Sequence, residues 1–177
     1  MNHLKYIREY FSEQDGFYHG SNIKLNSLKL MPSTSGESKF LGDGIYISNS
    51  KDISDSYGKY TYSVILSEPL NSLQYFEEID LNKFEEIRRI FQESENEDLN
   101  NIADDIEDDI RDNNLWWGKS LVSSLDRFGV SVKESLLLVG YNAIEAPINK
   151  LNQFMDRSDS ERNICIIKDD ILSIKSI

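Results

Sequence analysis

Four helix-forming segments in the middle of the chain restrict the fold more than any other feature of the sequence. Three of them carry apolar residues at helical spacing, a pattern that buries one side of a helix against its neighbours. These stripes are Phe84, Ile87, Ile90 and Phe91; then Leu99, Ile102, Ala103, Ile106 and Ile110; then Leu121, Val122, Leu125 and Phe128. Gly129 is expected to stop the third helix, and Ser131 and Gly140 are expected to begin and end the fourth.

Strand-forming runs lie on both sides of this helical middle. They are FYHGS at residues 17–21, GIYIS at 44–48, KYTYSVILS at 59–67, YNAIEA at 141–146 and, as one or two strands, RNICIIKDDILSIKSI at 162–177. An N-terminal helix containing Leu4, Ile7 and Phe11, a short helix capped by Ser50, and a loop over residues 147–161 are also predicted. Strands at both ends with helices between them predict an α+β fold. The length favours one domain, residues 1–177, with a helical insertion at about residues 76–139.

Negative charge is concentrated in this insertion. The chain has a formal net charge of −12, and residues 77–114 hold fifteen acidic and four basic side chains. A general attraction to nucleic acid phosphates is therefore not expected. The acidic segment is expected either to form the solvated faces of two amphipathic helices, or to serve as a lid, a docking face for a basic partner, or a mimic of nucleic acid.

The sequence argues against several kinds of site and location. No apolar run approaches the roughly 20 residues of a membrane helix, and the N-terminus lacks an apolar signal segment, so we expect a cytoplasmic protein with no membrane partner. The single cysteine, Cys165, excludes an intramolecular disulfide and is expected to be a core residue. The two histidines, His3 and His19, form no HExxH motif or zinc-ligand cluster, and no Walker A or GxSxG sequence is present. No metal site is expected.

His19, Gly20 and Ser21 end a predicted strand and form the first candidate motif. A glycine at this position lets a ligand approach the backbone closely. An imidazole beside backbone N–H and C=O groups suits a ribose hydroxyl and a carboxamide. The ordinary alternative is a histidine that is hydrogen-bonded at a strand end.

Tyr46 and Tyr57 form the second candidate motif. Tyr46 follows the glycine turn at residues 42–44, and Tyr57 follows the short predicted helix eleven residues later. Two aromatic faces can hold a flat ring between them. Core packing is the ordinary alternative in a chain with nine tyrosines.

The segments YHGS, LGDGIYIS and SDSYG together resemble the ADP-ribosyltransferase superfamily, in its diphtheria-toxin and poly(ADP-ribose) polymerase branch. That branch has a histidine–glycine–hydroxyl motif, then a glycine–x–glycine–Ile/Val–Tyr strand, then a helix that ends in a second tyrosine. The similar stretches are residues 17–21 and 41–58, and GYNAIEA and RNICIIKDDILSI look like the closing strands of phage and bacterial members. The resemblance implies a split β-sheet core that carries the acidic helices as an insertion.

The resemblance also implies that NAD is the substrate. The residues implied to bind it are His19, Gly20, Ser21, Gly44, Tyr46 and Tyr57. His19 would hold ribose hydroxyls, the Gly20 backbone would bind the carboxamide, and the two tyrosines would flank the nicotinamide. In many members a glutamate at the start of a late strand stabilises the positive charge that develops as the bond to nicotinamide breaks.

This chain departs from the family at that glutamate. Arg162, Asn163 and Ile164 stand where the family has a glutamate before an apolar strand. The candidate carboxylates are Glu161 first, then Glu145, and then Asp159, with solvated loop acids as the alternative reading of each. The predicted catalytic residues are therefore Tyr46, Glu161 and Glu145.

The function implied by the resemblance is NAD-dependent mono-ADP-ribosylation of a macromolecular target. The target is expected to be a protein rather than a nucleic acid, modified by a phage or bacterial effector in the cytoplasm, including that of a host. An NAD glycohydrolase, in which water is the acceptor, is one alternative. The other is an inactive binding module whose acidic insertion blocks a basic partner.

Overall fold

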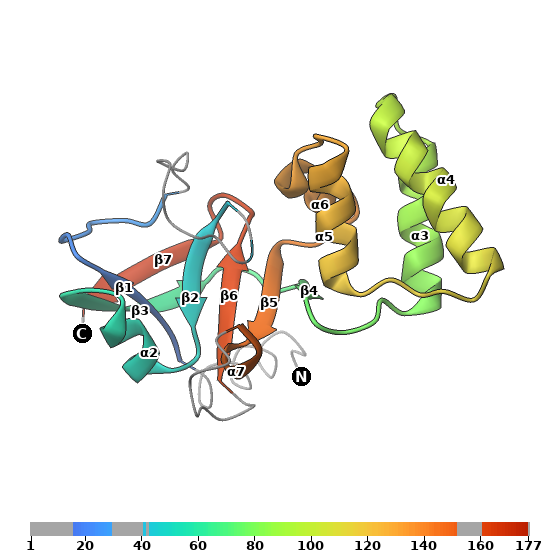
Figure 1. Cartoon of the computed structure of the whole chain (residues 1–177). Helices are drawn as coiled ribbons and strands as arrows, with labels where there is room; N and C mark the ends of the chain where they lie inside the picture. Colours follow the sequence, from blue (N-terminus) through green and yellow to red (C-terminus); the bar gives the residue numbers. More distant parts are fainter. Residues whose placement is uncertain (1–15, 30–40, 42, 152–160, 177) are drawn as a thin grey trace, which may run out of the picture. The chain divides into compact units, whose positions relative to one another are not determined.

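The chain is an α+β structure, which confirms the predicted fold class. The computed structural model describes residues 16–29, 41, 43–151 and 161–176 (Figure 1). These residues divide into two compact units. The sheet unit contains the described residues of 16–29, 44–69 and 147–176, and the helical unit contains residues 41, 43 and 70–146. The predicted N-terminal helix lies outside the described residues.

Five antiparallel strands form the sheet unit. They are β1 (Phe17–Ser21), β2 (Ile45–Ser48), β3 (Tyr60–Leu66), β6 (Arg162–Ile166) and β7 (Leu172–Ser176), in the order β6-β2-β1-β3-β7. The runs at residues 17–21, 44–48 and 59–67 are confirmed as strands, and the run at 162–177 forms two. The turn between these two contains Asp170, whose φ is 64°. Apolar side chains on alternate positions of these strands, such as Ile47, Val64 and Ile164, are buried.

The junction between β1 and β2 has the shortest pairing in this sheet. β1 pairs with β3 along its whole length, from Phe17 with Val64 to Ser21 with Tyr60. It pairs with β2 only through Tyr18 and Ser48. Beyond that pair the two described strands are not joined as a ladder, and this separated end carries Gly20 on β1 and Tyr46 on β2.

Helix α2 (Lys51–Ser56) follows β2 and packs against β1 (Figure 1). The helix is where the sequence predicts it, and Ser50 occupies its N-cap position. The prediction that the Ser50 side chain caps the helix, however, is wrong. The Ser50 hydroxyl makes no hydrogen bond to the helix backbone and instead donates to Oε1 of Glu161 at 3.0 Å. A carboxylate brought in by another segment has displaced the local capping interaction.

The helical unit contains the four predicted helices. They are α3 (Leu81–Gln92), α4 (Glu97–Arg111), α5 (Gly118–Arg127) and α6 (Val132–Leu138). Two short strands, β4 (Ser72–Gln74) and β5 (Ala143–Pro147), pair in parallel. β5 confirms the predicted run at residues 141–146, whereas three-residue β4 is too short to show an alternating pattern in the sequence. Within the described residues, no helix is long and apolar enough to cross a bilayer.

Part of the predicted loop over residues 147–161 is helical. Ile148–Leu151 form α7, a single turn, so the loop prediction is wrong there. The buried Ile148 side chain and a hydrogen bond from its N–H to the Glu161 carbonyl, at 3.0 Å, attach this turn to the start of β6. Residues 152–160 lie outside the described residues.

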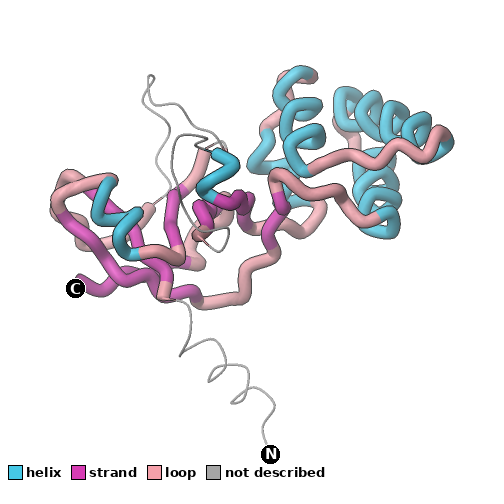
Figure 2. The backbone as a smooth tube through the Cα atoms, turned by 60° about the horizontal axis from the view of Figure 1, so that its bottom comes forward, coloured by secondary structure: helices cyan, strands magenta, loops and turns pink. Residues whose placement is uncertain are grey.

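Helices α3 and α4 lie side by side (Figure 2) and bury most of the predicted apolar stripes, with Ile90 and Ile110 half-buried. The fully buried residues include Phe84, Ile87 and Phe91 of α3 and Ile102, Ala103 and Ile106 of α4. Their N-termini are capped as side-chain chemistry predicts: Asp80 accepts from the N–H of Asn82 at 3.0 Å, and Asn96 accepts from that of Asp98 at 2.9 Å.

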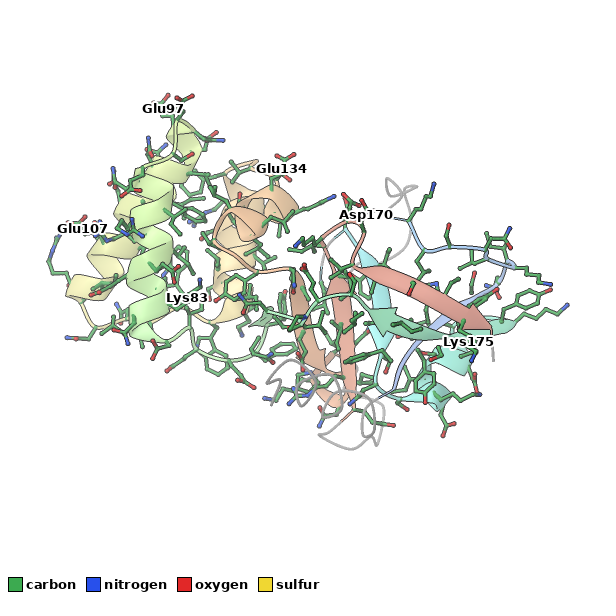
Figure 3. All side chains as sticks on the ribbon, turned by 180° about the vertical axis from the view of Figure 1, so that it is seen from behind. Lys83, Glu97, Glu107, Glu134, Asp170 and Lys175 are labelled. Atoms are coloured by element: carbon green, nitrogen blue, oxygen red, sulfur yellow. The ribbon has the colours of Figure 1, made fainter. Side chains whose placement is uncertain are left out.

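The acidic side chains of α4 lie on its exposed side, where Figure 3 shows Glu97 and Glu107 pointing away from the helices. Several of them form ion pairs within the helical unit. Glu107 lies 3.4 Å from Arg88 and 3.8 Å from Arg111, and Asp105 lies 3.5 Å from Arg127. The acidic segment thus forms amphipathic helices with solvated charged faces.

Tyr141 is expected to make the stability of the helical unit depend on pH in the alkaline range. Burial, together with the negative charge of Glu86, raises the pKa of Tyr141 to about 12. Because this pKa is higher in the folded than in the unfolded chain, the free energy of unfolding is expected to fall as pH rises from about 10 to about 12. Urea unfolding at several pH values, compared with Tyr141→Phe, measures this part of the pH dependence. If the free energy of unfolding falls equally steeply with pH in the native protein and in Tyr141→Phe, the prediction is contradicted.

Candidate functional site

Strand β1 holds the histidine motif beside β2. Nδ1 of His19 lies 2.8 Å from the carbonyl oxygen of Tyr46. A carbonyl oxygen only accepts, so Nδ1 carries the proton, and Nε2 of a neutral ring is then an acceptor. This hydrogen bond joins the two strands where their backbone pairing has ended, and Nε2 has the chemistry to accept from a ribose hydroxyl.

Gly20 and Gly44 are required by close backbone contacts. A Cβ at Gly20 would lie 1.9 Å from the carbonyl oxygen of Ser54 in α2, and one at Gly44 would lie 2.4 Å from Sγ of Cys165. Gly20 is expected to let a ligand approach the backbone, and the structure shows a second reason for glycine, which is the close packing of α2. The glycine therefore lets α2 lie directly on β1.

The two predicted tyrosines are both in the sheet unit. Tyr46 is half-buried on β2, opposite Cys165 of β6. Tyr57 is the C-cap residue of α2 and is 58% exposed. Its Cβ lies 3.0 Å from the position that a Gly20 Cβ would occupy, so Tyr57 stands above Gly20. No ring contact joins the two tyrosines among the described residues.

The strand register determines which side chains share a face of the sheet. Ser48 is opposite both Tyr18 of β1 and Asn163 of β6, and side chains alternate along each strand. Gly20, Tyr46, Ser48 and Asn163 therefore share one face, which we call the Tyr46 face. Tyr57 stands on this face because it lies above Gly20. His19 is on the opposite face, and its ring bonds the β2 backbone at the edge between the strands.

Glu161 precedes β6 and is the predicted carboxylate that the structure brings to this part of the sheet. It is two residues before Asn163 and faces the corner between β2 and α2, where its Oε1 accepts from Ser50. Asn163, buried with 8% exposure, is the residue directly opposite Ser48. Asn163 thus puts a neutral amide at this position of β6, and the Glu161 carboxylate stands two residues earlier, before the strand begins.

The other two predicted carboxylates lie elsewhere in the sequence: one is in the helical unit, and one is outside the described residues. Glu145 belongs to β5 of the helical unit, where its Oε2 accepts from Nε2 of Gln74 at 3.1 Å. Asp159 lies outside the described residues. In the described part of the chain, no group of three or more histidine, cysteine or acidic side chains is placed to hold a metal ion.

Polar contacts on the exposed side of α2 fix the helix that carries Tyr57. Lys51 and Asp55 form an ion pair at 2.9 Å, and the hydroxyl of Thr61 in β3 donates to Asp55. The Thr61 hydrogen bond and the lysine together lower the pKa of Asp55, and the hydrogen bond to Asp55 raises the pKa of Lys51. The Thr61 hydrogen bond therefore attaches the C-terminal part of α2 to β3, and the ion pair lies within the helix.

Sequence reasoning misses the role of three consecutive residues, Ser48, Asn49 and Ser50, in holding the start of β6. Their side chains contact residues 161 and 162, more than one hundred positions later in the chain. A polar Ser-Asn-Ser triplet between a strand and a helix is also typical of an ordinary turn. Only the strand register reveals its partner.

Comparisons of the chain with protein-family models, curated proteins and solved structures found no match.

Proposed function

We propose that the protein is an NAD-dependent mono-ADP-ribosyltransferase. The observation that carries the proposal is the arrangement of the Tyr46 face. Tyr46 on β2 and Tyr57 above Gly20 stand on the same face, beside a β1–β2 junction with a single backbone pair. Glu161 stands directly before β6, the strand that pairs with β2, so neighbouring elements of the sheet unit supply aromatic groups for a flat ring and a carboxylate for a developing positive charge.

In this proposal each residue has a task that its chemistry allows. The rings of Tyr46 and Tyr57 flank the nicotinamide, the Gly20 backbone binds its carboxamide, and His19 accepts from a ribose hydroxyl through Nε2. The bond between nicotinamide and ribose breaks, nicotinamide leaves with the bonding electrons, and an acceptor on the target forms the new bond to ribose and loses a proton. Glu161 stabilises the positive charge on the ribose while this occurs.

The proposed target is macromolecular, a protein in preference to nucleic acid, and the protein acts as a phage or bacterial effector on a host component. The exposed acidic side of α4 supports a target with a basic surface, because opposite charges speed encounter. Salt would screen this attraction, so modification of such a target would weaken as ionic strength rises.

Labelled NAD incubated with a bacterial lysate tests the function. The native protein is expected to release nicotinamide and to transfer the label to a macromolecule. Tyr46→Ala is expected to lose both activities by about tenfold or more, because one aromatic contact contributes about 0.5–1.5 kcal/mol and its loss also opens the site to water. Tyr46→Phe keeps the ring and serves as the matched control.

The outcomes separate the alternatives. Label found only as free ADP-ribose, across lysates from several hosts, would assign an NAD glycohydrolase and contradict the transferase. No nicotinamide release, together with no NAD binding by calorimetry, would contradict both enzymes. A partner bound equally well by the native protein and by Tyr46→Ala would then indicate the binding module.

A further inference from the structure

Three consecutive side chains, at the end of β2 and in the turn before α2, hydrogen-bond the start of β6. The Ser48 hydroxyl donates to the Arg162 carbonyl at 2.8 Å, and Oδ1 of Asn49 accepts from the Arg162 N–H at 2.8 Å. The Ser50 hydroxyl donates to Oε1 of Glu161 at 3.0 Å. The Ser48 oxygen also accepts from the N–H of Ser50 at 3.0 Å, which closes the turn. We call residues 48–50 the Ser-Asn-Ser corner.

The corner divides its contacts between backbone and side chain. Ser48 and Asn49 hold the N–H and carbonyl of Arg162 and so fix the backbone that follows Glu161. Ser50 contacts the Glu161 carboxylate. The backbone next to Glu161 and one oxygen of its carboxylate are thereby both held by hydrogen bonds.

Ser50 makes this contact at the expense of a local interaction. It is at the N-cap of α2 with extended dihedral angles, φ −112° and ψ 121°, from which a serine hydroxyl normally accepts from the backbone of the first turn. The hydroxyl bonds Glu161 instead. Departures from a strong local preference are concentrated at functional sites, because there the distant contact has been retained over the local one.

We propose that Ser50 is the positioning residue for Glu161, an inference that rests on the proposed function. Ser50 touches neither NAD nor the target. It holds one carboxylate oxygen so that Glu161 has a single orientation toward the ribose while the bond to nicotinamide breaks. Orientation affects the rate of the chemical step more than it affects substrate binding.

Ser50→Ala, Ser50→Thr and Ser56→Ala test this role in nicotinamide release. Ser50→Ala is expected to lower kcat by about tenfold to 100-fold with little change in KM, because it releases the carboxylate without touching the NAD site. Ser50→Thr keeps a hydroxyl and is expected to restore most of kcat. Ser56→Ala is the matched control, since the Ser56 hydroxyl bonds the Ile53 carbonyl within α2, and its kcat is expected to equal that of the native protein.

A double-mutant cycle with Glu161→Ala shows whether Ser50 acts through that carboxylate. In the Glu161→Ala background, Ser50→Ala is expected to cause no further loss of kcat. The same cycle measured as Tm tests the contact itself, independently of activity. The loss of Tm in the double variant is expected to be smaller than the sum of the losses in Ser50→Ala and Glu161→Ala. The cycle requires active native protein only for its kinetic arm.

The possible failures are distinct. Native kcat in Ser50→Ala, or a further loss of kcat in the Glu161→Ala background, would overturn the positioning role and leave the proposed function intact. A native protein that binds no NAD and releases no nicotinamide would overturn the proposed function and this role with it.

Discussion

Glu161→Gln is expected to slow nicotinamide release by about 100-fold to 1,000-fold, the range found when a group that stabilises transition-state charge is removed. Glutamine has nearly the same shape and can still accept from Ser50, so Tm is expected to stay within a few degrees of the native value. In the proposed mechanism, the substitution removes only the negative charge beside the ribose. Stopped assays of nicotinamide release, with NAD binding measured by calorimetry, separate a loss of chemistry from a loss of binding.

Glu145→Gln is the matched control for this experiment. It makes the same chemical change on β5, where the carboxylate bonds Gln74. Its rate is expected to match that of the native protein. A larger loss in Glu145→Gln than in Glu161→Gln would move the catalytic role to the β5 carboxylate.

Gly20→Ala is expected to lower the free energy of unfolding by about 3 kcal/mol, the upper part of the usual range for overpacking. The added Cβ would lie 1.9 Å from the Ser54 carbonyl oxygen, and neither the strand nor the helix backbone can give way cheaply. Urea unfolding monitored by circular dichroism measures the change. The steric clash would also displace α2 and with it Tyr57.

Gly129→Ala controls for the general effect of replacing a glycine. Gly129 has a φ of 72°, and a Cβ there would meet nothing within 4 Å. Gly129→Ala is therefore expected to lower the free energy of unfolding only by the cost of the left-handed conformation, about 1–2 kcal/mol. A smaller loss in Gly20→Ala than in Gly129→Ala would show that α2 can move away from β1 at little cost.

The helices and most strands could be predicted because each repeats a local pattern. The stripes of α3 and α4 have helical spacing over three to four turns, and β1, β2 and β3 combine β-prone residues with turn residues at their ends. β4 and α7 could not be predicted in this way, since three or four residues contain no full period. They depend on neighbours supplied by distant segments, such as β5 beside β4.

The candidate site was predictable in its residue types but not in its geometry. The sequence indicates that His19, Tyr46 and Tyr57 are unusual, yet it cannot show that His19 and Tyr46 lie on opposite faces, because this follows from strand register. It also cannot show that Ser50 bonds Glu161, because its spacing equally suits a helix cap. In both cases the decisive interaction is between residues far apart in the chain.

The single backbone pair between β1 and β2 is a place where this sheet can open locally. One ladder joins β1, β3 and β7, and another joins β2 and β6, so the two groups of strands can hinge apart without breaking either ladder. Opening at this seam breaks few backbone hydrogen bonds, so its free-energy cost is expected to be low. The amide protons on either side of the seam, near Gly20 and Tyr46, should therefore exchange with solvent faster than those in the middle of β3.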